Sequence, residues 1–243
     1  MKSSRLLVLW AGLLLTGVVQ AQVETYTQNV GESGGGWLDD GQPYGASFVQ
    51  TIHSSSFVSL TNIAVTLNIS SLNANGDVFA YISNNVSGKY AVLLNRPGWN
   101  NINQAGYRDN GYNVTIDDLA GASRDIHTYH VTLGLALNGT LGTPLTGSWS
   151  SDGRTSFVDW TGPTVLDVNN SDPRLATLGT LDKAGLSPSG DWTLFIADLS
   201  SGGDVVLNSW ALELMGVVPE PSSVLLLAGG LPALWWMVRR RKS

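Results

Sequence analysis

The sequence of 243 residues predicts an all-β exported domain, an antiparallel β-sandwich, between an N-terminal signal peptide and one C-terminal hydrophobic helix. Three observations predict this class. Short segments of alternating apolar and polar residues recur through the middle of the chain, separated by turns rich in Gly, Asn, Ser and Asp. No stretch between the two ends carries a long helical stripe. Long apolar runs occur only at the ends, each beside basic residues.

Residues 1–21 have the layout of a cleaved secretion signal. Two basic residues, Lys2 and Arg5, precede an apolar stretch that is too short to predict a transmembrane helix. Small or apolar residues occupy the positions that signal peptidase reads. We expect cleavage between Ala21 and Gln22; an uncleaved anchor is the alternative.

The exported region, residues 22–221, is strongly acidic. The formal charge of −6 for the whole chain hides this, because six of the 13 basic residues lie in the two terminal segments. Seven basic residues therefore face all 19 acidic residues, which gives the region a net charge of −12. Such a field repels nucleic acid, so we expect no nucleic-acid partner. The chain has no Cys, and its core must hold the domain without disulfides.

Residues 22–42 are expected to form a flexible lead-in, because glycines dominate the stretch from Gly31 to Gly36. Gly31, Ser33 and Gly35 match the G-x-S-x-G pattern of hydrolases. That pattern needs a strand before the serine and a helix after it. Three consecutive glycines follow Ser33 instead, so we interpret the match as chance.

The sandwich is expected over residues 43–216. In residues 63–69 every second residue is a large aliphatic one, which predicts a strand with one buried face. The same pattern, or a short apolar run after a turn, predicts further strands at residues 78–82, 90–94, 112–116, 192–196 and 210–214.

No catalytic constellation is visible in this region. The three histidines are His53, His127 and His130, and on a strand the last two would point to opposite faces. Serines are plentiful, but without a placed base or an oxyanion hole they do not predict a nucleophile. We therefore expect no enzymatic activity, and we interpret each histidine as a surface residue or a hydrogen-bonded strand residue.

We expect no cofactor unless it is calcium, whose oxygen ligands suit an acidic domain. Asp117 and Asp118 end a predicted strand where loop carbonyls could join them, and they are the candidate metal site. Residues 167–172 offer oxygens at alternate positions but lack the glycine and glutamate of an EF-hand. The alternative for all of these carboxylates is a turn or capping role.

Trp99 is the candidate ligand contact. It follows Pro97 and Gly98, so we expect it in a loop with its ring exposed, where it could stack on a sugar. Trp192 and Trp210 lie in alternating segments and are expected in the core.

Residues 217–243 form a tail with three chemical features. A stiff, extended acidic turn comes first, formed by Pro219, Glu220 and Pro221. Residues 222–238 are uncharged, and as a helix they span ~25 Å, short of a ~30 Å hydrocarbon core. A basic end then stays on the cytoplasmic side; it consists of Arg239, Arg240, Arg241 and Lys242. The tail is predicted to be a marginal membrane stop.

This order and spacing resemble the PEP-CTERM sorting signal of Gram-negative bacteria. The resemblance implies an exosortase as the processing enzyme and a transient stay in the inner membrane. It also implies export to the cell surface or extracellular matrix, typically with exopolysaccharide production. The alternative is an ordinary single-pass anchor.

A second set of stretches in the exported region carries a likeness to a known module: Gly76 to Val78, Leu93 to Arg96, Gly106-Tyr107, residues 112–118, Ser148-Trp149 with Asp152 to Arg154, Gly190 to Asp198 and Leu207 to Leu212. Together they resemble a P/Homo B domain, the module that follows the catalytic domain of subtilisin-like proprotein convertases. The likeness covers roughly residues 41–216 and implies a jelly-roll-like sandwich. In convertases the catalytic triad lies in a separate subtilisin-like domain, so the likeness implies no protease here.

Three functions remain open at this point. The first, which we favour, is a non-enzymatic cell-surface or exopolysaccharide-matrix protein sorted through its tail. The second is an accessory module that acts with a separate subtilisin-like serine endopeptidase. The third is a carbohydrate-binding module that uses Trp99.

Overall fold

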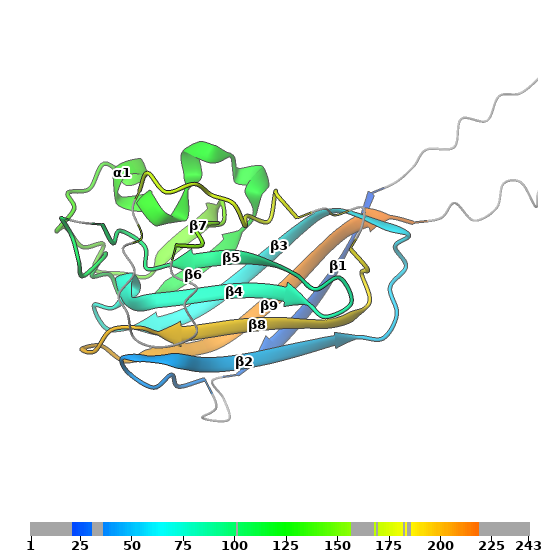
Figure 1. Cartoon of the computed structure of the whole chain (residues 1–243), viewed down its shortest axis with the longest axis horizontal. Helices are drawn as coiled ribbons and strands as arrows, with labels where there is room; N and C mark the ends of the chain where they lie inside the picture. Colours follow the sequence, from blue (N-terminus) through cyan, green and yellow to red (C-terminus); the bar gives the residue numbers. More distant parts are fainter. Residues whose placement is uncertain are drawn as a thin grey trace, which may run out of the picture.

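The computed structural model describes residues 21–30, 36–100, 102–156, 168, 170–181, 183 and 186–218. It confirms the predicted fold class, because two β-sheets pack face to face as a sandwich (Figure 1). One sheet has the strand order β1-β9-β3-β6-β7 and the other the order β2-β8-β4-β5. The strands are β1 (Ala21–Asn29), β2 (Gln42–Ile52), β3 (Ser59–Ser71), β4 (Val78–Asn84), β5 (Lys89–Asn95), β6 (Tyr112–Ile116), β7 (Leu145–Trp149), β8 (Gly190–Asp198) and β9 (Val205–Val217).

The alternating segments form strands because one face of each is buried between the sheets. The large aliphatic residues of β3, from Ile63 to Ile69, are at most 1% exposed. Trp192 on β8 and Trp210 on β9 join the same core cluster, as predicted. A second, smaller cluster lies on the other face of the four-stranded sheet, around Phe79 and Phe195.

The prediction of a flexible lead-in over residues 22–42 is wrong for its first part. β1 pairs with β9 along its whole length, from Ala21 opposite Val217 to Asn29 opposite Ser209. The apolar signal of this strand is weak, because Tyr26 alone of its residues packs against the core. Residues 31–35, which include Ser33, lie outside the described residues.

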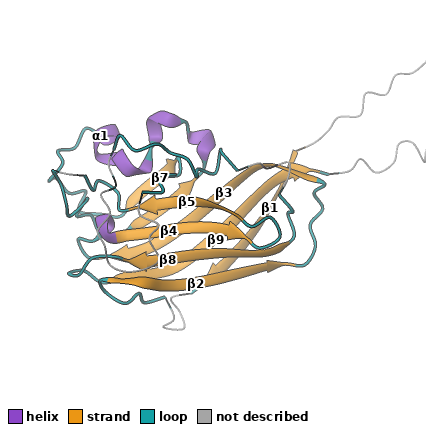
Figure 2. Ribbon diagram, viewed as in Figure 1, coloured by secondary structure: helices purple, strands orange, loops and turns teal. Residues whose placement is uncertain are grey.

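Between β6 and β7 the chain forms short helical segments and no strand, at one end of the sandwich (Figure 2). They are the 3-10 turns η3 (Asp118–Ala120), η4 (Ala122–Arg124) and η5 (Ile126–Thr128) and the helix α1 (Tyr129–Leu133). Because this connection carries the chain back to the start of β6, β7 pairs with β6 in parallel. Among the paired strands of the described chain, this pair is the exception to the predicted antiparallel arrangement.

The register of β9 defines two ends of the molecule. At one end, Val217 lies opposite both Ala21 and Ser59. At the other end, Val205 lies opposite Ser71. The 13 residues of β9 separate these ends by about 40 Å, at the usual rise of a strand. The start of β1 and the end of β9, to which the predicted signal and tail would connect, therefore lie side by side at the end away from Val205 (Figure 1).

No helix in the described part of the chain is long and apolar enough to cross a membrane. The predicted transmembrane segment 222–238, the sorting motif and the basic end all lie outside the described residues.

Candidate functional site

The two histidines that the sequence placed on a strand lie instead in η5 and at the start of α1, and both are fully buried. His127 Nδ1 lies 2.9 Å from Asp152 Oδ2, and its Nε2 lies 3.1 Å from the carbonyl oxygen of Trp99. The pair has the His–Asp geometry of a catalytic triad, but a backbone carbonyl occupies the place of the nucleophile.

His130 is held in the same way. Its Nε2 lies 2.7 Å from Asp109 Oδ2, and its Nδ1 lies 3.0 Å from the carbonyl oxygen of Ala136. The hydroxyl of Tyr129 donates to the same Asp109 oxygen at 2.5 Å. Both ring nitrogens of each histidine thus lie within hydrogen-bond distance of a protein oxygen, so neither ring presents a free nitrogen to a substrate. These side chains tie the segment between β6 and β7 to the sandwich.

The calcium candidates Asp117 and Asp118 are already hydrogen-bonded to protein donors. Asp117 caps η3 by accepting from Leu119 N at 2.9 Å, and it also accepts from Asn62 Nδ2 at 3.0 Å. Asp118 accepts from the backbone N–H and the hydroxyl of Ser151, both at 2.8 Å, and from the N–H of Gly179.

Within the described residues, no three His, Cys, Asp or Glu side chains are grouped as a metal site. Calcium binding at Asp117 and Asp118 therefore stays a sequence-based prediction. An ion there would have to displace or share the hydrogen bonds that now hold η3.

The prediction that Trp99 is exposed is wrong, because its side chain is 1% exposed. The chain turns inward at this point, with the N–H of Trp99 donating to Arg96 O at 2.9 Å. Gly98, at φ +80°, leaves room for the ring of Tyr107, which a Cβ at this position would overlap. The guanidinium of Arg96 lies 5.2 Å from the centre of the Trp99 ring. Trp99 is therefore a core residue of a folded loop and has no free face for a sugar.

Three charged residues meet at the end of the four-stranded sheet that lies away from Val217. They are Asp77 before β4, Arg96 after β5 and Asp198 at the end of β8, and each is less than 9% exposed. β4 lies between β5 and β8, and Asp198 lies opposite Val78 in the ladder. A guanidinium nitrogen of Arg96 lies 3.8 Å from Asp77 Oδ1. Each of these residues comes from a different stretch of the P/Homo B resemblance.

Both carboxyl groups in this cluster resist ionisation. Burial raises the pKa of Asp198 to about 7, and the nearby Asp77 and Asp40 add to the rise, against one backbone hydrogen bond from Ser200. Burial also raises the pKa of Asp77 to about 6, although Arg96 opposes that shift. One oxygen of Asp198, Oδ2, is buried with no hydrogen-bond partner. One arginine thus lies beside two carboxyls, and near neutral pH the cluster holds part of a proton.

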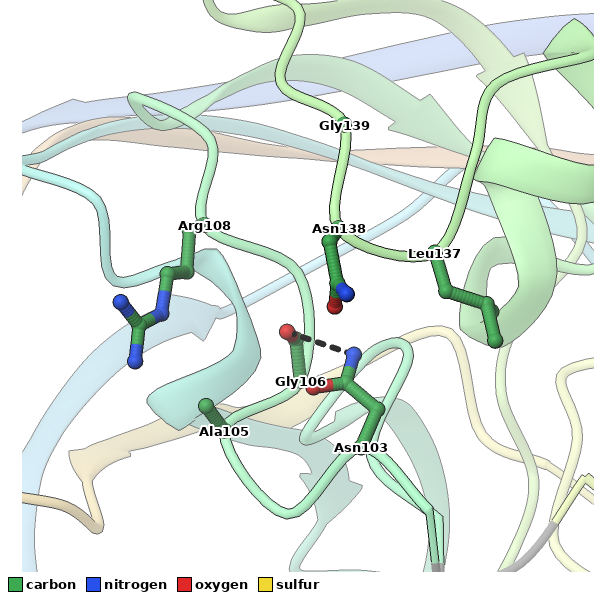
Figure 3. A pocket seen from close by; sticks show the side chains of 7 residues that line it. All are labelled: Asn103, Ala105, Gly106, Arg108, Leu137, Asn138 and Gly139. Carbon is green, nitrogen blue, oxygen red and sulfur yellow. Dashed lines mark hydrogen bonds between the residues drawn. The ribbon is translucent and has the colours of Figure 1, made fainter.

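A polar groove opens beside this cluster. It consists of two adjoining pockets of about 670 and 320 Å³, which share Ala105, Arg108, Asn138 and Gly139. The wider pocket reaches Asp77 and the loop after β8, and its further lining residues are Asn73, Gln104, Thr140, Ser200, Ser201 and Gly202. Figure 3 shows the narrower pocket, with Arg108 and Asn138 on facing segments and the Asn103 side chain donating to Gly106 O at 2.8 Å.

Beside the groove, two glycine backbones touch. A Cβ on Gly76 would overlap the carbonyl oxygen of Ala105 and the backbone of Gly106, which itself has φ +63°. The N–H of Gly76 also donates to Tyr107 O at 2.8 Å. This contact fixes the loop that carries Arg108 beside Asp77. Among the residues that line the two pockets, amide and hydroxyl side chains predominate, and no aromatic ring is present.

The sequence alone did not single out this groove. Asp77, Arg96 and Asp198 lie in the stretches that resemble the P/Homo B domain, and a charged residue inside an apolar strand segment is the signal that could have marked Asp198. Arg108 and Asn138 follow no pattern, since they come from irregular loops that only the fold brings together.

Comparison with known proteins adds two solved structures. No family model and no curated protein matches this sequence. The serine protease of Aeromonas sobria, in complex with its chaperone ORF2, is 13% identical with a TM-score of 0.42, over 82% of this chain and 28% of the protease chain. The same protease in another crystal structure is 14% identical with a TM-score of 0.41, over 81% and 27% of the two chains. The present chain thus spans little more than a quarter of these proteins.

Proposed function

We propose that this chain is an exported, non-catalytic accessory module of the P/Homo B type, which acts with a separate subtilisin-like serine endopeptidase at the cell surface. One observation carries the proposal. Asp77, Arg96 and Asp198 come from three separate stretches that resemble that domain, and the fold brings them into one buried cluster beside an open groove. In the described residues, His127 and His130 are buried and lie within hydrogen-bond distance of Asp152 and Asp109, which supports a non-catalytic module.

The layout of the molecule supports a role in binding at a surface. The groove lies beside the loop after β8 and therefore at the end of β9 away from Val217. A tail that continues from Val218 would leave the opposite end. If residues 219–243 act as an exosortase sorting signal, the groove faces away from the inner membrane during processing and remains open to a partner.

The proposal can be tested with a fluorophosphonate probe, which labels the active serine of serine hydrolases. Residues 22–218, immobilised on resin, should take up no label themselves, because the proposed module carries no activated serine. From a labelled envelope fraction of the host, they should retain a labelled endopeptidase. Asn138→Arg, which fills the groove, should abolish this retention. Val58→Arg, at an exposed position near Val217, should not.

Labelling of the domain itself would overturn the non-catalytic assignment. Equal retention by the Asn138→Arg variant, or no labelled band at all, would overturn the accessory role.

A second candidate function is that of a matrix protein which binds the host's own exopolysaccharide. The amide and hydroxyl side chains of the groove favour it, because they suit hydroxyl-rich ligands. The same resin, incubated with purified exopolysaccharide, distinguishes the two candidate functions. Binding that Asn138→Arg removes, together with no labelled endopeptidase, would establish the matrix role instead.

A further inference from the structure

Arg108 is an exposed arginine with no bonded partner in the described part of the chain. Among the described arginines it alone makes no hydrogen bond, ion pair or ring contact. The other four each donate to protein oxygens or lie over a tryptophan ring; they are Arg96, Arg124, Arg154 and Arg174. The guanidinium of Arg108 thus keeps all of its donors for a ligand.

Arg108 lies where the two pockets of the groove adjoin, since it lines both of them (Figure 3). Apart from Arg108, Asp77 is the only ionisable residue among the described residues that line the two pockets. The other polar side chains there are amides and hydroxyls. The groove therefore presents one positive charge among neutral donors and acceptors.

This lining suits a single carboxylate on a peptide. A guanidinium donates two parallel hydrogen bonds to a carboxylate, and side-chain amides can donate to and accept from a peptide backbone. A phosphate group carries a charge of about −2 and would need a second cation, which the lining residues do not supply. A sugar would find no aromatic ring among the lining residues, and a uronate polymer would bring many carboxylates to a strongly acidic domain.

We propose that the groove binds a peptide segment through one acidic side chain, whose carboxylate pairs with Arg108. The amide of Asn138, on the facing segment, is placed to bind the backbone of the same peptide (Figure 3). The segment belongs to the partner endopeptidase, an identity that rests on the proposed function.

Asp77 makes this binding depend on pH. Burial raises the pKa of Asp77 to about 6; Arg96 and Arg108 oppose the rise and Asp40 adds to it. Asp198 lies close enough to interact with it as well. As the pH rises through about 6, Asp77 ionises and repels the carboxylate of the ligand, which is itself ionised above about pH 4. The acidic peptide should therefore bind more tightly at pH 5.5 than at pH 8.

A phage-displayed library of random heptapeptides tests the proposal on the full-length chain in detergent micelles. Peptides that the wild type retains should share one Asp or Glu among uncharged residues, and Arg108→Gln should select no such peptide. Lys89→Gln is the matched control and should select like the wild type. It removes the same charge from an exposed position at the start of β5, opposite Asn84 and away from Asp77.

Fluorescence anisotropy then compares a retained peptide with a derivative in which an amide replaces the acidic side chain. The wild type should bind the acidic form at least about tenfold more tightly, because only that form makes a charge-assisted pair. Arg108→Gln should bind both forms alike, and Asp77→Asn should bind the acidic form equally at pH 5.5 and pH 8.

Three outcomes would overturn the proposal: retained peptides without an acidic residue, an Arg108→Gln variant that still prefers the acidic form, or displacement of the peptide by a uronate polymer at matched carboxylate concentration. Retention of acidic peptides by a chain that retains no labelled endopeptidase would confirm the site and reject the proposed partner.

Discussion

At the scale of single residues, the paired carboxyls of Asp77 and Asp198 make stability depend on pH. Their pKa values in the fold, about 6 and about 7, lie above the ordinary value of 3.8 because burial disfavours the charged forms. The stability that their protonated forms contribute is therefore complete below the pKa that each group has in the unfolded chain. It is lost as the pH rises through the folded values, between about 4 and 7.

The variant Asp198→Asn tests this linkage. The wild type should melt at progressively lower temperature from pH 5 to pH 8, in the window about those pKa values. The amide cannot ionise, so the variant should lose part of that slope and melt a few degrees higher than the wild type at pH 8. Asp39→Asn, at an exposed position, should keep the wild-type slope. A parallel drop of the Asp198→Asn curve at every pH would contradict the assignment.

Trp99 gives a second prediction at this scale. Because its ring is buried beside Arg96 and its carbonyl faces His127, Trp99→Ala should lower the unfolding free energy by about 3–5 kcal/mol. Ile102→Ala, in the same loop but 88% exposed, should change it by no more than about 0.5 kcal/mol. Urea denaturation measures both. A Trp99→Ala variant as stable as wild type would mean that the ring is exposed after all.

At the scale of elements, β1 is anchored by one side chain. The carboxylate of Glu24 accepts hydrogen bonds from the hydroxyl of Ser55, from both donors of Ser56 and from the hydroxyl of Tyr26, at 2.6 to 2.9 Å. Burial would raise the pKa of Glu24, but these hydrogen bonds outweigh it and lower the pKa to about 2. The anchor therefore stays ionised above about pH 4 and is lost only as the pH falls toward 2.

Deletion of residues 22–29 should expose the edge of β9 and destabilise the sandwich. We expect a lower melting temperature and aggregates on size-exclusion chromatography, because β9 is a long strand that would lose one of its two neighbours and become an edge. Glu24→Gln, which removes only the charge of the anchor, should melt between the deletion and the wild type. A deletion variant that melts like the wild type would restore the flexible lead-in that the sequence predicted.

The sequence predicts elements where burial imposes a pattern and fails where it does not. β3, β6 and β9 each bury one face, and their sequences alternate accordingly; β8 is buried on both faces, and its sequence is an apolar run after a turn. β1 lies at an edge and is mostly polar on both faces, so its sequence has the pattern of a linker. The groove could not be predicted, because Arg108 and Asn138 meet Asp77 only through the contact of Gly76 with Gly106.

At the scale of the whole molecule, the groove and the ends of the described chain lie at opposite ends of the sandwich. Val217 lies opposite Ala21, so a tail and a signal peptide would both join at one end, and the groove lies at the other. Cleavage after Ala21 would leave β1 intact from Gln22 onward.

The tail carries its own prediction from sequence. Glu220→Ala should leave membrane insertion intact but block processing, so that the full-length protein accumulates in the inner membrane. Replacement of the four basic residues after Val238 should instead release unprocessed protein, because nothing then halts export. Immunoblots of cell fractions measure both. Normal maturation of Glu220→Ala in the presence of the host exosortase would leave a plain anchor as the better interpretation.

The central claim is that the groove binds a serine endopeptidase, and photocrosslinking in living cells tests it most directly. A photoreactive amino acid at Asn138, in the groove, should cross-link to a protein that a fluorophosphonate probe also labels. The same amino acid at Val58, beside Val217 and also exposed, should not. Labelled cross-links from Val58 alone, or from neither position, would contradict the account.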